Sequence, residues 1–484
     1  VEGAAFADLL GRDLDEFGLF RWDPQSVSFV PIPFQIDERY DRTFNPDVPE
    51  LTFVEKVYDV FGEEDGRLDQ DDELAFMYQD VGFKAPPEAP WPEWADPERY
   101  EIAVEDPRPG SGETTRWVYL YTGPSPPRSD RTYVSWPVGN GASIETELFA
   151  LDYEGNWLMT GYRVLPPCGG GSDLIDRMKG RARPLPNRTE DEEGWSGSST
   201  FLGGIVGPVR AIRYVRGAQS GVNTMHHDIV YDSFWYRKVN LRVHPILDAW
   251  LYIDWLPQPD SRLFTPDARD GVVVDGAPDP QIPQTPAAWH VMTGAQGGMA
   301  VAYEVPPSDK YGSLEGYYRD DADYDDTIPE NPDYGDEDDA SIGAFGNRVV
   351  DVSDTNIDPV TMEYRVYPLC SGEGNALVGD TIDAYQRYPL EADPHPQSVT
   401  LGPVRGVEVT REGADVVLAW DAIPSAEQGY RVYASDDPAV PEGAWTRLGD
   451  TTDIEYVDAG AANEPGSRFY SVVGLDEDGD EGPW

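Results

Sequence analysis

Basic residues are scarce in this 484-residue chain. There are 36 Lys and Arg residues against 90 Asp and Glu, which gives a formal net charge of −54, and only five of the basic residues are lysines. Binding to nucleic acid or to an anionic membrane surface needs a basic face that displaces counterions from phosphate groups. The composition therefore argues against both partners. Because 39% of the residues are hydrophobic and 12% are aromatic, we expect a folded chain with an acidic surface.

Long apolar runs and familiar catalytic motifs are also missing. No stretch of about 18 apolar residues exists, so no segment of this chain is expected to insert into a membrane. The chain opens at Val1 and shows no charged-then-apolar leader, which favours a removed export signal or a trimmed chain. The sequence has no GxSxG, HExxH or CxxC motif and no glycine-rich phosphate-binding loop after a strand. No reaction class is therefore marked by a motif.

The excess of acid has three explanations. Concentrated salt screens charges over about 3 Å at molar ionic strength, so an acid-rich, Lys-poor surface suits a high-salt habitat. Carboxylates are also the hard oxygen ligands that calcium prefers. The third explanation is an ordinary solvated surface in an organism whose codon usage favours Arg.

Glycine and proline are frequent, with 48 and 44 residues, and they interrupt the chain too often for long helices. The segments between them alternate or run in β-branched and aromatic residues, which predicts an all-β chain of several β-sandwiches. We expect strands at 211–215, 229–243, 249–255 and 299–305. Short helices are expected at 6–17 and 174–179. Proline-dense stretches predict connectors or edge-hugging loops at 86–97, 278–286 and 389–396.

The segment from about 399 to 484 predicts a small sandwich, because six short strands alternate with turns of Gly, Asp, Pro and Ser. Trp420 is expected to be buried, and Tyr430 and Tyr433 are the aromatic residues of the next strand. The segment resembles a fibronectin type III domain. The residues that match this family's penultimate strand and closing turn are Phe469, Tyr470, Val472, Asp476, Asp478 and Gly479. The resemblance implies an extracellular spacer or adhesion element.

A weak internal repeat organises the rest of the chain. YRVLPPCGGG begins at Tyr162 and YRVYPLCSGEG begins at Tyr364, and a GPVR tetrapeptide follows each copy, at 207–210 and at 402–405. If the repeat is structural, GPVR marks the start of a new domain. The predicted domains are an N-terminal β domain, a central β-sandwich-like domain and the terminal module, at 1–200, 201–398 and 399–484.

The two cysteines, Cys168 and Cys370, stand at matching positions of this repeat. Two cysteines are too few for a disulfide scaffold, but cysteines at matching strand ends could lie close enough to bond. The alternatives are a disulfide between them and two independently buried thiols.

The N-terminal region carries two motifs, PIPFQIDERYD from Pro31 and DVFGEEDGRLDQDDELAFMYQDVG from Asp59. They resemble exported bacterial proteins of unassigned function, and this resemblance implies no activity. The acidic spacing fails the EF-hand pattern, because its first position falls on Phe61. A calcium loop of another kind and a solvated turn before the LAFM strand both stay open. The candidate calcium ligands are Asp65, Asp69, Asp71, Asp72 and Glu73.

A second acidic cluster fills 320–339, with the sequence DDADYDDTIPENPDYGDEDD and no apolar period. It predicts either a loop ordered by calcium or a solvated insertion. The candidate ligands here are Asp320, Asp321, Asp323, Asp336 and Asp338.

Four of the five histidines, His226, His227, His244 and His290, could suggest a transition-metal or acid–base site. Adjacent residues of a strand face opposite sides, so at most one of His226 and His227 can join any given site. Polar residues satisfied at strand ends are the favoured interpretation.

Two functions from different classes follow. The first is a non-enzymatic extracellular or cell-surface structural protein, such as a matrix, surface-layer or filament subunit, stabilised by calcium or high salt. It would associate with copies of itself or with other cell-surface components. The alternative is a secreted carbohydrate-active enzyme or polysaccharide-binding protein, because one aromatic stretch resembles the large sandwiches of mutarotase-like sugar enzymes. Its residues are Phe234, Trp235, Tyr236, Trp250, Tyr252 and Trp255, which could equally be core. The missing catalytic motifs and the terminal module favour the first function.

Overall fold

The computed structural model describes residues 1–484 except 87, 88, 93, 97, 109–114, 325–341, 399–403, 424, 425, 427, 442, 443, 464, 465, 476–478, 480, 483 and 484. Strands hold 48% of the chain and helices 9%, which confirms the all-β prediction. The described α-helices are α1 (Glu192–Ser198) and α2 (Ala376–Arg387). The 3-10 turns are Gly3–Ala5, Ala7–Leu9, Leu14–Glu16, Pro49–Leu51, Tyr78–Asp80 and Ala461–Asn463. No helix among these residues is long and apolar enough to cross a membrane.

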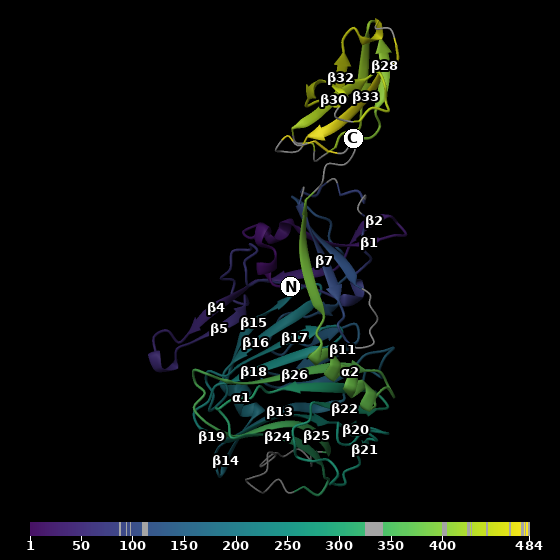
Figure 1. The fold of residues 1–484 in the computed structure, drawn as a ribbon. Coiled ribbons are helices and arrows are strands. Elements are labelled where there is room, and N and C mark those ends of the chain that lie inside the picture. The colour runs from purple at the N-terminus through teal and green to yellow at the C-terminus, as the bar shows by residue number, and fades with distance from the viewer. Residues whose placement is uncertain are drawn as a thin grey trace.

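Two large sheets form the central sandwich, in the lower half of Figure 1. The five-stranded sheet has the order β14 (Arg188–Asp191), β13 (Ile175–Leu185), β19 (Ile246–Trp255), β25 (Ile342–Val352) and β24 (Ser313–Asp320). The nine-stranded sheet has the order β15 (Thr200–Val206), β16 (Arg210–Arg216), β17 (Met225–Tyr231), β18 (Trp235–Leu241), β26 (Val360–Leu369), β23 (Gly297–Glu304), β22 (Trp289–Gly294), β20 (Arg262–Phe264) and β21 (Val272–Val273).

The inner faces of the two sheets share one hydrophobic core. Leu251 and Ile253 of β19 pack in the same buried cluster as Val239 of β18 and Val366 of β26. Tyr364 bridges the sheets, because its hydroxyl donates to the Leu251 carbonyl at 3.2 Å. This cluster includes residues from Val134 to Val366. The predicted division at residue 200 therefore passes through a continuous core.

The predicted strands at 211–215 and 249–255 fall within β16 and β19, and the one at 299–305 overlaps β23, which ends at Glu304. The run at 229–243 is a hairpin of β17 and β18, because Asp232 and Ser233 make a polar turn between them. The helix expected at 174–179 is wrong: this segment enters β13, which pairs along β19. A six-residue helix is marginal without tertiary packing, whereas the neighbouring strand satisfies the backbone.

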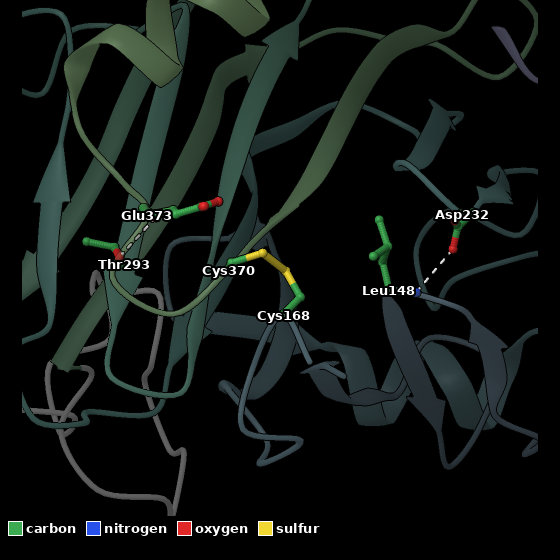
Figure 2. The surroundings of a disulfide bond; sticks show 6 residues. All are labelled: Leu148, Cys168, Asp232, Thr293, Cys370 and Glu373. Carbon is green, nitrogen blue, oxygen red and sulfur yellow. Dashed lines mark hydrogen bonds between the residues drawn. A yellow bond between two sulfur atoms is a disulfide. The ribbon is translucent and has the colours of Figure 1, made fainter. Parts of the chain in front are cut away.

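The disulfide between Cys168 and Cys370 is present, so that alternative is confirmed. The bond joins the loop after β12 (Met159–Val164) to the end of β26, and Figure 2 shows it there. The two α-carbons are 4.4 Å apart, and the Ser371 amide donates to the Cys168 carbonyl at 3.0 Å. The bond links the nine-stranded sheet to a four-stranded sheet of β12, β11 (Phe149–Tyr153), β10 (Ile144–Thr146) and β9 (Val134–Ser135).

A separate five-stranded sheet stands above the sandwich in Figure 1. Its order is β2 (Ser28–Pro31), β1 (Phe17–Asp23), β8 (Arg116–Thr122), β7 (Glu98–Glu105) and β27 (Glu391–Ser398). The segment expected to be helical at 6–17 forms only 3-10 turns and the first residue of β1. The proline-dense segment at 389–396 was expected to be a connector or edge-hugging loop, but most of it is the edge strand β27. The strand leads towards the terminal module (Figure 1).

Two pairs of strands connect this sheet to the sandwich. β3 (Phe34–Asp37) pairs with β6 (Glu73–Phe76), and β4 (Arg39–Phe44) pairs with β5 (Phe53–Tyr58). Phe53 and Val57 of the β4–β5 hairpin pack against Ile212 and Ile229 on the outer face of the nine-stranded sheet. Farther along the same face, Ile382 of α2 packs in a cluster with Trp289. Parts of this face are therefore covered by the chain itself.

The terminal module has its own small core. One sheet holds β28 (Glu408–Glu412), β29 (Asp415–Ala419) and β32 (Glu455–Asp458), and the other holds β31 (Thr446–Thr451), β30 (Gly429–Ser435) and β33 (Phe469–Leu475). Trp420 is buried as expected, and its ring meets that of Tyr430 edge-on at 5.3 Å. The match to Asp476 and Asp478 lies outside the described residues. The fibronectin type III resemblance stays a prediction.

Candidate functional site

The first GPVR motif docks onto the PFQID strand. Arg210 begins β16, and its backbone amide donates to the side-chain oxygen of Gln35 at 2.9 Å. Its guanidinium donates to Asp37 at 2.8 Å and to Glu73 at 2.5 Å. Sequence reasoning did not select Arg210 as a site residue, although both motifs were visible. These contacts join the β3–β6 strand pair to the nine-stranded sheet.

Three of the proposed calcium ligands have structural partners. Glu73 also accepts from the Tyr58 hydroxyl at 2.7 Å. Burial favours the neutral acid, but Arg210 and this hydrogen bond lower the pKa of Glu73 to about 2. Asp72 is fully buried and accepts from the backbone amides of Arg39 and Asp69 at 3.0 and 2.7 Å. Asp71 forms an ion pair with Lys56 at 3.2 Å.

The loop between β5 and β6, residues 59–72, is here named the acidic loop. Asp65 accepts from the Arg67 amide at 3.1 Å, and Glu38 accepts from the Gly66 amide at 2.7 Å. Gly66 has a φ of +76°, a conformation that favours glycine. The loop is therefore held by carboxylate-to-backbone bonds, one within the loop as in a turn and one from Glu38, which precedes β4.

Carboxylates around the acidic loop lie close enough to repel one another. Burial, and behind it the carboxylates of the loop, raises the pKa of Glu38 and of Glu64. Burial raises the pKa of Asp72 to about 6, with smaller contributions from Glu38 and Asp69. Yet no three His, Cys, Asp or Glu side chains in the described part of the chain are arranged to hold a metal ion. Calcium binding at this loop stays a prediction.

The second acidic cluster is only partly described. Asp320 ends β24 and is 2% exposed, and its carboxylate accepts from the amides of Asp275 and Gly276, both at 2.8 Å. It holds a neighbouring turn in place. Asp321 accepts from the Asp323 amide at 3.1 Å within a local turn. Asp336 and Asp338 lie outside the described residues.

The histidines do not form a common site. His226 faces the interior, where its ring lies 4.3 Å from that of Trp157, whereas His227 packs 4.9 Å from Tyr214 on the outer face. Burial lowers the pKa of His226 to about 4 and that of His227 to about 3. Burial likewise lowers the pKa of His290 to about 3. Each is therefore neutral near pH 7, inside a packed region.

The centre of the sandwich holds a buried charge network that the sequence did not reveal. Asp228 of β17 is fully buried and accepts two hydrogen bonds from Arg237, at 2.7 and 3.0 Å. It also accepts from Trp235 at 2.9 Å and from Tyr153 at 3.0 Å. Burial favours the neutral acid, but the charge of Arg237 and a hydrogen bond from the His226 ring hold the pKa of Asp228 well below its usual value. The carboxylate is committed to structure.

A row of stacked aromatic rings lies on the outer face of the nine-stranded sheet. Ring centroids are 4.8 Å apart for Tyr231 and Phe234, 5.7 Å for Phe234 and Tyr367, and 6.1 Å for Tyr367 and Tyr385. The Arg108 guanidinium lies 3.8 Å from the Tyr385 centroid. We name these four rings the aromatic row. Of the six aromatic residues proposed from the sequence, four are buried: Trp235, Trp250, Tyr252 and Trp255.

A hollow of about 200 Å³ lies beside one end of the aromatic row. This volume is below the roughly 300–1,000 Å³ of typical small-molecule pockets. Its lining includes Val1, Glu73, Tyr78, Arg210, Tyr231 and Leu390.

The edge of the N-terminal sheet contains a second buried charge. Arg99 of β7 is 6% exposed, and its guanidinium donates to the Gln397 side chain of β27 at 2.9 and 3.1 Å. Gln397 in turn donates to Glu101 at 3.1 Å. The aromatic rings around the guanidinium are those of Phe29, Trp91, Tyr119 and Tyr121. β27 thus completes the surroundings of a buried charge on its neighbour.

Comparison with known proteins gives no family for this chain. No protein-family model matches it, and no curated protein matches it significantly.

Proposed function

We propose that this protein is a non-enzymatic extracellular structural protein, which assembles with further copies and displays its terminal module. The observation that carries the proposal is β27. This strand closes the edge of the N-terminal sheet and is followed, after residues 399–403, by the terminal module. A sheet edge that is completed by one strand is a place where one chain can join another by supplying that strand.

The use of charge supports the same function. Asp228, Glu73 and Asp248 each contact an arginine, and Asp248 contacts both Arg183 and Arg348. Catalytic carboxylates are instead expected in a cleft with perturbed pKa values that suit proton transfer near the working pH. The buried acids described above are used to hold strands together.

The disulfide supports an extracellular location, because such bonds persist in oxidising compartments. The resemblance of the terminal module to fibronectin type III domains points the same way. Each copy of such an acidic chain carries a large negative charge, so two copies repel one another. Assembly should therefore need salt or divalent cations to reduce this repulsion.

Light scattering and negative-stain imaging across a sodium and calcium series test this function. We expect assemblies whose size grows with cation concentration. A monodisperse monomer in every condition would contradict the proposal.

A second function, polysaccharide binding, is favoured by the aromatic row, since aromatic faces stack on sugar rings. Tyr385 is 38% exposed at one end of this row, and Tyr388, just beyond α2, is 43% exposed outside it. If the row binds sugar, Tyr385→Ala should weaken retention on a panel of immobilised polysaccharides and Tyr388→Ala should not. Equal retention of both variants and the native chain would remove this function.

A further inference from the structure

β27 is held to the N-terminal sheet mainly through its backbone. All eight of its residues pair with β7, from Glu391 opposite Glu105 to Ser398 opposite Glu98. The side chains at 391–397 are exposed or half-buried. Main-chain pairing of this kind gives affinity without depending on which chain donates the strand.

The sheet is incomplete without this strand. The Arg99 guanidinium would keep its bond to the Tyr121 hydroxyl at 2.7 Å but lose both bonds to Gln397. Loss of a hydrogen-bond partner from a buried charged group is costly. The edge of β7 therefore needs a strand with glutamine opposite Arg99, from this chain or from another copy.

The outer edge of β27 is blocked by two prolines. Pro394 and Pro396 are two residues apart, so their backbone nitrogens face the same side of the strand. Proline within a sheet is tolerated where its nitrogen faces away from the paired neighbour. Both prolines therefore face outward, and no further strand can pair fully with that edge. The sheet can therefore be extended at β7 by one strand and no further.

The connection into β27 is short. α2 is fixed on the sandwich, where Ile382 packs near Trp289, and it ends at Arg387. β27 begins at Glu391, so only residues 388–390, including Pro389, link the two elements. Short hinges favour exchange of an element between copies, because opening the hinge relieves its constraint.

We propose that β27 is exchanged between copies of this chain, so that β27 of one copy pairs with β7 of the next and carries its terminal module along. This inference rests on the proposed assembling function and names the contact that would join the copies. The register is the one seen within the chain, with Gln397 of one copy opposite Arg99 of the other.

Single cysteines on different copies test the exchange. Val104 of β7 stands opposite Ala392 of β27. Ala392 is two residues before Pro394, so its backbone N–H also points away from β7, and Ala392 and Val104 form a non-hydrogen-bonded pair. The α-carbons of such a pair are about 4.5 Å apart, a separation that suits a disulfide. Val104→Cys and Ala392→Cys chains are co-expressed and oxidised. The native cysteines are already bonded to each other, so they add no free thiol.

We expect the product to shift from the mass of one chain to that of two. The matched control combines Ala392→Cys with Ser26→Cys, an exposed turn position away from β7, and should stay at the mass of one chain. Cation-dependent assembly without the 104–392 product would overturn the exchange and leave the assembling function standing. No product and no assembly in any sodium or calcium condition would overturn both.

A hinge variant gives a second measurement. Insertion of Gly-Ser-Gly between Leu390 and Glu391 lengthens the connection, so each β27 can more readily return to its own sheet. We expect the two-chain product to be lost in this background. An undiminished yield would contradict the role of the hinge and with it the proposed exchange.

Discussion

Carboxylates occupy opposite surroundings in the sandwich and in the acidic loop. Asp228 lies beside Arg237 on the neighbouring strand of the same sheet, which keeps the pKa of Asp228 low despite its burial. Asp72 and Glu64 lie among other acids, and burial and this repulsion raise their pKa values. The net charge of the chain is therefore a poor guide to where charge acts. What matters is which carboxylates have an arginine beside them.

The disulfide gives the largest expected effect, because it joins the nine-stranded sheet covalently to the four-stranded sheet. The bonded cysteines are 202 residues apart. On the chain-entropy model, closing so long a loop stabilises the folded state by about 5 kcal/mol at most. We expect the Cys168→Ala, Cys370→Ala double variant to unfold at lower urea concentration than the native chain. Two free thiols on titration of the denatured, unreduced native protein would contradict the bond itself.

The Asp228 network should give the next largest effect. Asp228→Asn leaves Arg237 buried without its counter-charge, and breaking a buried pair in this way costs about 3–5 kcal/mol. The urea midpoint, followed by tryptophan fluorescence, should fall markedly. The matched control is Asp380→Asn, which breaks the half-exposed pair with Arg269 and should cost at most about 1 kcal/mol. Equal shifts for the two variants would contradict the contrast between buried and exposed pairs.

Sequence reasoning reached the features that depend on local pattern or on repeated motifs. Strand alternation is local, so the all-β class and the strand at 249–255 were predictable. The paired Pro-Cys-Gly segments predicted that Cys168 and Cys370 could bond, as one of two alternatives, and the structure contains that bond. Partners distant in sequence were not predictable: Arg210 contacts Asp37 173 residues away, and Gln397 contacts Arg99 298 residues away. The prolines at 389–396 led to the prediction of a connector or loop instead of a strand. An edge strand such as β27 tolerates proline, whereas a central strand does not.

Calcium should act on the acidic loop and leave the sandwich unchanged. A ligand that binds only the folded state stabilises it by about 2.7 kcal/mol at a hundredfold excess over its dissociation constant. We expect millimolar calcium to raise the melting midpoint relative to excess chelator at fixed ionic strength. Asp69→Asn should reduce this increase, whereas the control Asp380→Asn, which lies on α2 outside both acidic clusters, should leave it unchanged. Identical melting midpoints with calcium and with chelator would contradict calcium binding by the folded protein.

Mild acid should also stabilise the protein, because protonation reduces the repulsion between carboxylates at the acidic loop. We expect this to be the smallest of the effects. The folded-state pKa values of Glu38, Glu64 and Asp72 are raised, so the folded protein binds protons more readily than the unfolded chain near pH 6. Their contribution is fully present below the unfolded pKa values near 4 and is lost as the pH rises through the folded values, about 6 for Asp72. The melting midpoint should therefore rise from pH 7.5 to pH 5.5.

Glu73 has a lowered pKa, so its stabilising contribution survives in this window. Glu64→Gln should reduce the pH dependence, whereas Glu408→Gln, on an exposed strand of the terminal module, should leave it unchanged. A melting midpoint that falls steadily as the pH is lowered from 7.5 to 5.5 would show that the carboxylates of the acidic loop, like Asp228, are stabilised in their charged form.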